Sequence, residues 1–309
     1  MKAVQIEKFG TPDVLKITEL DQPNPKQNEL LIRVKAVSIN PLDYKVRNGS
    51  LSPLLKLRLP FIIGSDFAGI VESAGNTVQN FEPGDRVFGS LSPFRSGACA
   101  EYITVKAAQV APIPDEVSFD EAAAIPIAGL TALHALRDMA KISEGEKVII
   151  NGASGGVGSF AVQLAKIMKA QVTGVCSTAN VQFVTELGAD KVIDYKKESF
   201  LTVTEKYDLF FDVVSNATLK NAQRVLSQNG MYVATLPSPL KIFKSFISPQ
   251  KVKIVMVKKR VDDLNYLAEL TAKKKLKNII SKSFSLDDIR QAHAAIESGK
   301  VKGKLVVAI

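Results

Sequence analysis

One segment of this chain limits its possible folds more than any other. The apolar run Val148-Ile149-Ile150-Asn151 leads directly into Gly152-Ala153-Ser154-Gly155-Gly156-Val157-Gly158, and an amphipathic stretch to Met168 follows. We therefore expect a strand, a glycine-rich turn and a helix in this order. Short apolar runs and helical stretches continue to alternate after this segment, as a parallel sheet covered by helices requires. The expected strands are 147–151, 171–175, 191–194, 207–214, 231–235 and 252–257, and the expected helices are 156–168, 181–187, 219–226 and 261–273.

The spacing of the glycines is typical of a loop that binds the pyrophosphate of a dinucleotide. We expect Gly155 to let the chain turn sharply and approach the phosphates, and Gly158 to let the helix pack closely on its strand. Free amides at the start of the helix favour anionic oxygens. Ala153 stands where the first glycine is usual, and the alternative is a glycine-rich turn without a ligand. The candidate phosphate-binding residues are Ser154, Gly155, Gly156 and Val157.

The residues after the second strand of this series indicate which dinucleotide is preferred. NAD sites usually place Asp or Glu there, to hold the ribose 2′-hydroxyl. The segment here is Cys176-Ser177-Thr178-Ala179-Asn180, which has no acid and offers hydrogen-bond donors at Ser177, Thr178 and Asn180. NADPH is therefore favoured over NADH. The segment has no cation of its own, the nearest being Lys191, Lys196 and Lys197, and a helix cap by Ser177 or Thr178 is the alternative.

The residues before Pro114 have a different pattern. Short alternating runs at 30–37, 67–75 and 102–105 are separated by turn signals such as Pro83-Gly84-Asp85, which argues for an antiparallel barrel or sandwich. At 309 residues the chain is longer than most single cores grow. The predicted fold class is therefore α/β with two domains, and a last helix at 286–297 precedes a strand at 304–308.

Composition sets the remaining limits. Hydrophobic residues make up 46% and charged residues 23%, as in ordinary soluble proteins. The net charge is +9, with lysine clusters at 251–260 and 273–277, which are either solvated surfaces or a patch for cofactor phosphates or membrane headgroups. Two cysteines cannot form a disulfide framework and fit a reducing compartment, so we expect a cytoplasmic protein without a secretory signal or membrane span.

Seven short motifs together carry a resemblance to a known family. The motifs are Asn40-Pro41-Leu42-Asp43-Tyr44-Lys45, Gly64-Ser65-Asp66-Phe67-Ala68-Gly69, Pro83-Gly84-Asp85-Arg86-Val87, Ala128-Gly129-Leu130-Thr131-Ala132, the glycine loop, 187–195 and Gly303-Lys304-Leu305-Val306-Val307. With these motifs the chain resembles, over its whole length, the medium-chain dehydrogenase/reductase superfamily in its zinc-independent quinone oxidoreductase branch, and is similar to the chloroplast-envelope quinone oxidoreductase homologues and fruit enone oxidoreductases.

The resemblance implies a GroES-like antiparallel β-barrel substrate domain at 1–117, completed by 276–309, and a doubly wound Rossmann domain at 118–275. It also implies an active site between the two domains and a homodimer made by pairing of Rossmann edge strands. The turn Ser215-Asn216 stands where the family usually has a glycine-rich turn. The cofactor contacts that the resemblance implies, beside the glycine loop, are Thr131, Ser177, Tyr195, Ser215, Asn216, Leu236 (the residue after Thr235) and Lys304.

Zinc is not expected in this chain. Alcohol dehydrogenases of the superfamily hold zinc with Cys and His, yet their Gly-His-Glu segment is replaced here by Gly64-Ser65-Asp66. Cys99, Cys176, His134 and His293 lie far apart in the sequence.

The resemblance implies reduction of a quinone or an α,β-unsaturated ketone by hydride from NADPH. Negative charge then develops on the acceptor oxygen, and a positioned donor stabilises it. The candidate catalytic residues are Asn40, Asp43, Tyr44 and Lys45, with Asn40, Tyr44 and Lys45 as donors and Asp43 orienting Lys45. The alternative reading is structural, because Asn40 is a good N-cap and Asp43 a good first-turn acid of a helix.

Two other functions remain open. One is a non-catalytic NADPH-binding protein that associates with RNA or a membrane surface through its basic stretches. The other is a zinc-free alcohol or aldehyde reductase, since a fold does not fix a function.

Overall fold

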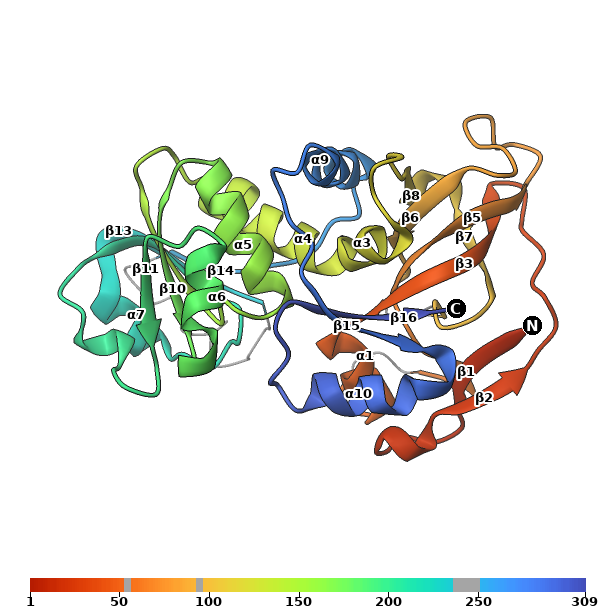
Figure 1. Ribbon diagram of the computed structural model, residues 1–309, viewed down its shortest axis with the longest axis horizontal. Coiled ribbons are helices and arrows are strands. Elements are labelled where there is room, and N and C mark those ends of the chain that lie inside the picture. Colours follow the sequence, from red (N-terminus) through yellow and green to blue (C-terminus); the bar gives the residue numbers. More distant parts are fainter. Residues whose placement is uncertain (53–56, 93–96, 236–250) are drawn as a thin grey trace. The chain divides into compact units, whose positions relative to one another are not determined.

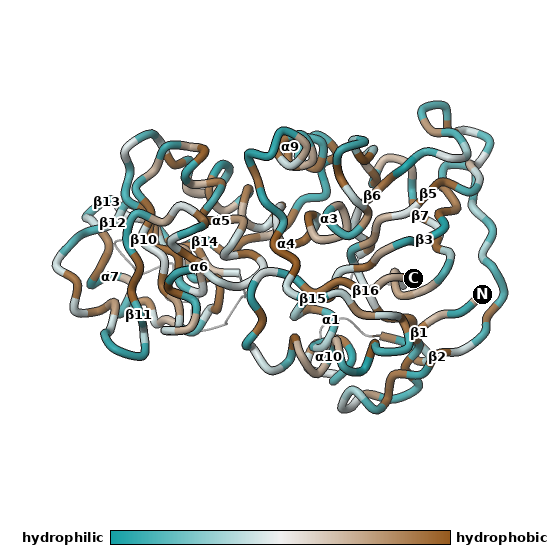
Figure 2. The backbone as a smooth tube through the Cα atoms, viewed as in Figure 1, coloured by the Kyte–Doolittle hydropathy of each residue, from teal (hydrophilic) through white to brown (hydrophobic). Residues whose placement is uncertain are grey.

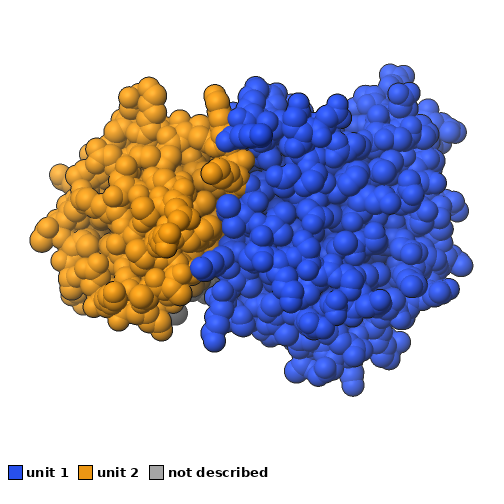
Figure 3. All heavy atoms as spheres, viewed as in Figure 1, with its two compact units in different colours: residues 1–127, 259–274, 278–309 blue, residues 128–258, 275–277 orange. Residues whose placement is uncertain are grey.

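The computed structural model of the protein describes residues 1–52, 57–92, 97–235 and 251–309. The chain forms two compact units, shown in blue and orange in Figure 3. Unit 1 contains residues 1–127, 259–274 and 278–309, and unit 2 contains residues 128–258 and 275–277. Among the described residues, no helix is long and apolar enough to cross a bilayer.

Unit 2 is built on a parallel sheet with the strand order β11-β10-β9-β12-β13-β14 in the described part of the chain (Figure 1). The chain builds outward from β9 in one direction and then, from β12 onward, in the other. Such a reversal leaves a crevice at the carboxyl ends of the strands, where ligands bind in doubly wound folds. The strands are β9 (Lys147–Asn151), β10 (Gln171–Cys176), β11 (Lys191–Asp194), β12 (Tyr207–Asp212), β13 (Leu226–Ala234) and β14 (Lys251–Ile254). The helices are α5 (Gly156–Ile167), α6 (Val181–Glu186), α7 (Leu219–Val225), the π-helical η3 (His134–Ala140) and the short η4 (Thr178–Asn180) and η5 (Phe200–Thr202).

The central strands of this sheet are apolar on both faces. Val148, Ile149 and Ile150 of β9 and Phe210 and Phe211 of β12 are all fully buried. Strands covered on both sides lose the alternation of half-exposed strands, which is why they read as continuous apolar runs. Each such side chain stabilises the fold by about 1.5–3 kcal/mol when it leaves water.

Unit 1 contains two sheets in its described residues. The larger has the order β15-β16-β3-β5-β6-β8, with β7 paired to β3, and only the β15–β16 pair is parallel. The smaller has the order β2-β1-β4. The strands of the larger sheet are β3 (Glu29–Ile39), β5 (Asp66–Ala74), β6 (Arg86–Ser90), β7 (Tyr102–Lys106), β8 (Val110–Pro112), β15 (Ile280–Ser285) and β16 (Lys304–Ala308). Those of the smaller are β1 (Lys2–Ile6), β2 (Lys16–Glu19) and β4 (Phe61–Ile62).

Helices complete unit 1. Its described helices are α1 (Pro41–Arg47), α3 (Phe119–Ala124), α9 (Val261–Ala272), α10 (Ile289–Glu297) and the short η1 (Pro12–Val14), η2 (Ala107–Gln109) and η6 (Leu286–Asp288). Helix α4 (Pro126–Leu133) contains the sequence boundary between the units, which falls after Ile127. Figure 2 shows α4 as a hydrophobic segment, and Ala128, Leu130 and Leu133 are buried.

The predicted α/β class, with an antiparallel sheet followed by a parallel one, is confirmed. The helices and strands predicted after residue 146 are present, with ends shifted by a few residues. Strand β13 begins five residues earlier than the predicted 231–235, and the strand at 280–285 was not predicted.

The compact units divide the chain at different residues from the predicted 118–275 Rossmann domain. Residues 118–127 belong to unit 1 because α3 packs on β3 and β5. Residues 259–274 also belong to unit 1, because α9 packs on β8. Helix α9 follows the parallel strand β14 in the sequence but belongs to the other unit. The periodicity of the sequence alone does not show this.

Candidate functional site

The glycine loop connects β9 to α5 at the carboxyl end of the parallel sheet. A Cβ atom on Gly158 would lie 2.1 Å from the Gly152 carbonyl oxygen, so only glycine lets α5 pack this closely on the loop. The sharp turn is at Gly152, whose φ is +86°, and not at Gly155, whose φ is −80°. The prediction that Gly155 makes the turn is therefore wrong. A Cβ on Gly155 would lie no nearer than 3.6 Å to a protein atom, so the protein itself leaves this position open.

The loop also meets the end of the neighbouring strand. Gly155 is the N-cap of α5, and Gly156 and Val157 form its first turn, whose amides have no partner within the helix. The Asn180 side-chain amide donates a hydrogen bond to Ser154 Oγ at 2.9 Å. The structure thus brings together the candidates of the glycine loop and one of those that follow β10.

The segment after β10 lies beside the end of β11. Cys176 pairs with Asp194, and the Tyr195 amide donates to the Cys176 carbonyl at 3.0 Å, so that Ser177 and Tyr195 extend from adjacent strand ends. Tyr195 is 54% exposed. The Thr178 hydroxyl lies near the Asp194 carboxylate, and its use as a donor to a phosphate stays a prediction.

The three cations nearest to this segment in the sequence have different places. Lys191 begins β11 at the opposite end of the strand and bonds Glu205 at 2.6 Å. Lys196 lies against the Tyr195 ring, with its Nζ 5.4 Å from the ring centroid. Lys197 Nζ is 3.9 Å from Asp194. The fold therefore places exposed positive charge beside Ser177 and Tyr195, which the sequence of the turn alone did not indicate.

A buried carboxylate organises the turn after β12. Asp212 accepts hydrogen bonds from the Ser215 amide at 2.9 Å and from the Asn151 side chain at 2.8 Å. Asn151 also donates to Asn216 Oδ1 at 2.8 Å. Ser215 has a φ of +59°, a left-handed conformation that usually requires glycine. Ser215 thus takes a backbone conformation that glycine adopts without strain, and Asp212 is a supporting residue that no motif of the sequence indicated.

The three remaining cofactor candidates lie in different parts of the chain. Thr131 lies in the part of α4 that belongs to unit 2 and is buried. Leu236 lies outside the described residues. Lys304 lies in unit 1, at the start of β16, where its side chain is buried. Lys304 therefore lies in the same unit as the predicted catalytic residues, and its contact with a cofactor stays a prediction.

The predicted catalytic segment leads into a buried polar cluster of Asn40, Asp43, Ser65, Asp66 and Lys304. Lys304 Nζ donates to Asn40 Oδ1 at 2.5 Å, and Asn40 Nδ2 donates to Asp66 Oδ2 at 2.9 Å. The Asn40 main-chain amide donates to Asp43 Oδ2 at 2.7 Å, and Ser65 Oγ donates to Asp43 Oδ1 at 2.9 Å. All five side chains are at most 3% exposed.

Strand register explains how this cluster forms. Leu305 pairs with Ile39, and Ser38 pairs with Asp66. The residues at the ends of three neighbouring strands therefore meet where β3 ends and α1 begins. Asp66 additionally accepts a hydrogen bond from the Ile127 amide at 3.2 Å, in the first turn of α4.

Burial controls the electrostatics of the cluster. Loss of solvent raises the pKa of Asp43 to about 7, and the neighbouring charge of Asp66 acts in the same direction. Burial also raises the pKa of Asp66, although Lys304 opposes the shift. Burial lowers the pKa of Lys304, and both carboxylates oppose this change. One ammonium group thus faces two carboxylates in a dry environment.

These contacts correct two of the predicted roles. Asn40 is 2% exposed, with its side-chain oxygen bonded to Lys304 and its nitrogen to Asp66, so it does not present an amide to a substrate. Asp43 faces Lys304 and Asp66 and does not orient Lys45. Asp66 and Lys304 were missed as members of this group, although charged residues next to apolar strands were a usable signal.

Tyr44 and Lys45 remain as the accessible candidates on α1. Both are half-buried, and neither side chain has a hydrogen-bond partner in the described parts of the chain. Burial lowers the pKa of Lys45. A hydroxyl and an amine without internal partners are available to an oxygen that gains negative charge.

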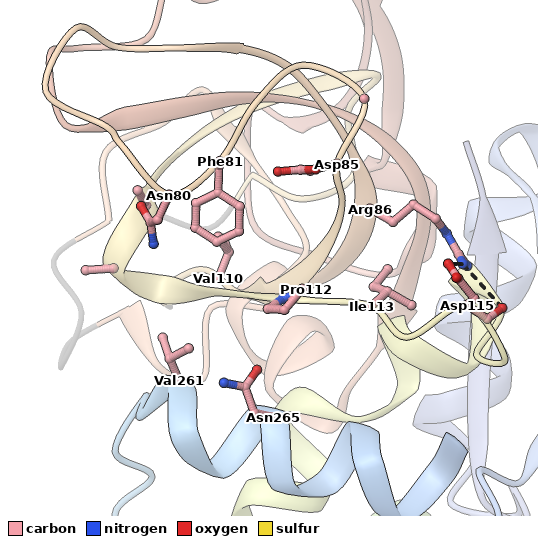
Figure 4. A pocket seen from close by; sticks show the side chains of 13 residues that line it. Asn80, Phe81, Asp85, Arg86, Val110, Pro112, Ile113, Asp115, Val261 and Asn265 are labelled. Carbon is pink, nitrogen blue, oxygen red and sulfur yellow. Dashed lines mark hydrogen bonds and ion pairs between the residues drawn. The ribbon is translucent and has the colours of Figure 1, made fainter. Parts of the chain in front are cut away.

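A pocket of about 770 Å³ lies elsewhere in unit 1, between β8 and the start of α9 (Figure 4). Phe81, Val110 and Val261 line it, with Asn265 on the α9 side. Figure 4 shows Arg86 turned toward Asp115, and the guanidinium also donates to the Val117 carbonyl. None of the predicted site residues lines this pocket, and we assign it no function.

Two family models match the chain. The alcohol dehydrogenase GroES-like domain matches residues 26–115, and a family described as zinc-binding dehydrogenase matches residues 187–307. The buried polar cluster does not suit zinc. Its cation is the ammonium of Lys304, and the nearby Cys99 thiol has a pKa far above its usual range because of burial and the charge of Asp43. Zinc sites are built from thiolates, neutral imidazoles and carboxylates; the five side chains of this cluster include no thiolate or imidazole, and both carboxylates already accept hydrogen bonds from Asn40 or Ser65.

Similarity to known proteins extends over the whole chain. A quinone-oxidoreductase homolog from Spinacia oleracea is 36% identical over 99% of this chain and 98% of its own length. A 2-methylene-furan-3-one reductase from Solanum lycopersicum is 32% identical over 99% of this chain and 79% of its own length. The crystal structure of Escherichia coli quinone oxidoreductase complexed with NADPH has a TM-score of 0.88 at 27% identity, with both chains fully covered. With its glycine loop, its strand order and these relatives, the chain belongs to the quinone oxidoreductase branch of the medium-chain dehydrogenase/reductase superfamily.

Proposed function

We propose that this protein transfers hydride from NADPH to a quinone or to an α,β-unsaturated ketone without the help of zinc. Its family makes it an oxidoreductase that uses a nicotinamide dinucleotide. The proposal adds the 2′-phosphate of the cofactor, the class of acceptor and the absence of a metal from the reaction.

The geometry of the glycine loop is the observation that best supports binding of a dinucleotide cofactor. Gly158 is pressed against Gly152, while a side chain on Gly155 would meet no protein atom closer than 3.6 Å. The loop is therefore tight where the helix packs and open where the pyrophosphate of a dinucleotide would approach. The unpaired amides at the N-terminus of α5 carry partial positive charge, which favours binding of the pyrophosphate at the same loop.

The choice of NADPH is supported by the ends of β10 and β11. Ser177, Asn180 and Tyr195 offer donors there, and Lys196 adds an exposed positive charge beside the Tyr195 ring. The acid of this region, Asp194, is only 7% exposed and accepts a hydrogen bond from the Lys196 amide at 3.0 Å. The exposed groups available to a doubly charged 2′-phosphate are thus donors and a cation, whereas the carboxylate is buried.

The class of acceptor is supported by the relatives and by α1. The Spinacia oleracea relative is named for quinones and the Solanum lycopersicum relative for the reduction of a conjugated furanone. NADPH, when bound, supplies the hydride. In this proposal Tyr44 and Lys45, whose side chains have no hydrogen-bond partner among the described residues, donate to the acceptor oxygen and stabilise the negative charge that this transfer creates. An enolate formed in this way takes a proton at its α-carbon to complete the reaction.

The test is an assay of the purified protein with quinones, short-chain enones and simple aldehydes, each with NADPH and with NADH. We expect reduction of quinones or enones, and a kcat/KM at least about tenfold higher for NADPH, which corresponds to about 1.4 kcal/mol from the 2′-phosphate. Lys196→Met should reduce this preference, while the matched control Lys191→Met, whose amine is bonded to Glu205, should not. Reduction of aldehydes alone, or equal use of the two cofactors, would contradict the proposal.

A further inference from the structure

We propose that Lys304 is a positioning residue of this enzyme, whose buried ammonium group fixes Asn40 and the first turn of α1 and thereby the places of Tyr44 and Lys45. The inference rests on the proposed function. It concerns a residue in the last strand of the chain that cannot touch a substrate itself, because its side chain is only 3% exposed.

The burial of Lys304 requires an explanation. Lysine is almost never fully buried unless it is paired, because an ammonium group without a partner is costly in a dry interior. The charge partners of Lys304 are Asp43 and Asp66, and its direct hydrogen bond is to Asn40 Oδ1. An apolar residue would fill this position at the start of β16 without such compensation. Lys304 therefore has a role that packing does not supply.

Asn40 transmits the effect of Lys304. Its side chain bonds Lys304 through the oxygen and Asp66 through the nitrogen, so that β16 and β5 both hold it. Its main-chain amide bonds Asp43, in the first turn of α1. The orientation of Asn40 and the start of the helix are thus tied to one cation.

The groups that depend on this arrangement are the next two residues of α1. Tyr44 and Lys45 follow Asp43 directly, and their side chains have no internal hydrogen bond among the residues that the structure describes. Their positions are therefore set by the helix backbone. A shift of about 1 Å in a reacting group can reduce a rate about 10²-fold, so a small rotation of α1 is enough to matter.

The cluster also gives the enzyme a specific pH response. The groups that face Asp43 are Asp66, Lys304 and the Cys99 thiol, with Ser65 as a neutral donor. Lys259 interacts with Asp66 and donates to the Ser90 carbonyl. Ionised Asp43 accepts bonds from both the Asn40 amide and Ser65, and protonation gives up part of this acceptor capacity. Turnover should then fall as Asp43 becomes protonated. Removal of the Lys304 charge makes the carboxylate harder to ionise and moves this acid limb to higher pH.

The main experiment compares Lys304→Met, which removes the charge but keeps most of the stem, with Lys302→Met, an exposed lysine two residues earlier. We expect Lys304→Met to lower kcat about tenfold or more, to leave the KM for NADPH unchanged and to shift the acid limb of kcat upward. Lys302→Met should behave as the wild type. A folded Lys304→Met protein with normal kcat and an unchanged acid limb would overturn the proposal.

Two further measurements keep the test decisive. If Lys304→Met does not fold, the variant Lys304→Met/Asp43→Asn removes one carboxylate together with the ammonium group and restores the net charge of the cluster. This variant should fold, turn over slowly and lack the acid limb of the pH profile. A wild-type kcat in this variant would reject the role of Lys304. Amide hydrogen exchange of residues 41–47 should accelerate in the charge-removed variants while that of 289–297 in α10 stays constant. This exchange does not depend on turnover, so it tests the positioning role even if the assay of the proposed function fails.

Discussion

Lys304 Nζ donates a hydrogen bond to Asn40 Oδ1 at 2.5 Å although 264 residues separate the two in the sequence. The bond is possible because β16 runs antiparallel to β3 and places the start of the last strand at the end of the third. The C-terminal strand therefore does more than complete a sheet. It brings the only described cation that bonds directly to the predicted catalytic segment.

The pH dependence of stability should report the unusual state of Asp43. Burial raises its pKa from about 3.8 to about 7, so the folded protein binds a proton that the unfolded chain has already lost between these values. The free energy of unfolding should therefore decrease as pH rises through this window, by an amount on the order of a few kcal/mol. Asp43→Asn has no such group and should show a smaller decrease.

Urea unfolding of both proteins at about pH 5 and about pH 8 measures this difference. Asp13→Asn, at a surface turn, is a suitable control for the loss of any one carboxylate. Parallel pH profiles for the wild type and Asp43→Asn would mean that Asp43 is not a buried acid of raised pKa.

The sequence was sufficient for the parallel sheet. Apolar runs such as 147–151 and 207–214 alternate with amphipathic stretches, and this alternation fixed the class and most of the elements of unit 2. It was not sufficient for the domain limits, because whether α9 packs on β8 or on the parallel sheet depends on contacts far apart in the sequence.

The glycine loop provides a prediction with an internal control. Gly158→Ala would place a Cβ 2.1 Å from the Gly152 oxygen, an overpacking that should cost about 1–3 kcal/mol or more and lower the thermal midpoint. Gly155→Ala has 3.6 Å of room and should fold normally, but its Cβ enters the space of the pyrophosphate. We expect it to weaken NADPH binding by about tenfold or more.

Thermal unfolding and fluorescence titration with NADPH separate these two effects. If Gly155→Ala binds NADPH as tightly as the wild type, the open position at Gly155 is not a phosphate site. A normal thermal midpoint for Gly158→Ala would show that the loop can relax away from α5.

The candidate site was predictable in its parts but not in its connections. The motif 40–45 pointed to the segment that leads into the buried polar cluster, and pattern and resemblance pointed to the glycine loop and to Tyr195, whose contacts with a cofactor stay predictions. Asn40 was expected to face a substrate, whereas its amide is used inside the protein. Such pairings arise when strand ends from three parts of the chain meet, and no local pattern around Asn40 contains that information.

Lys45 should stabilise the charge that develops on the acceptor oxygen. Lys45→Met removes the amine and keeps the apolar stem, so the protein should fold and bind NADPH normally. Loss of one such donor typically lowers kcat by about 10² to 10³. The loss should be smaller for a quinone, whose anion is already delocalised, than for an enone. Unchanged kcat on both acceptors, measured at saturating NADPH, would make Lys45 an ordinary surface residue.

The transfer of deuterium tests the central claim most directly. The protein would be supplied with an enone and with NADPH deuterated at either face of nicotinamide C4, and the product would be analysed by mass spectrometry and NMR. The proposed reaction predicts that one of the two labelled cofactors delivers one deuterium to the β-carbon of the saturated ketone, and that added chelator leaves the rate unchanged. A saturated ketone without deuterium from either cofactor, or a reaction that stops when zinc is removed, would contradict it.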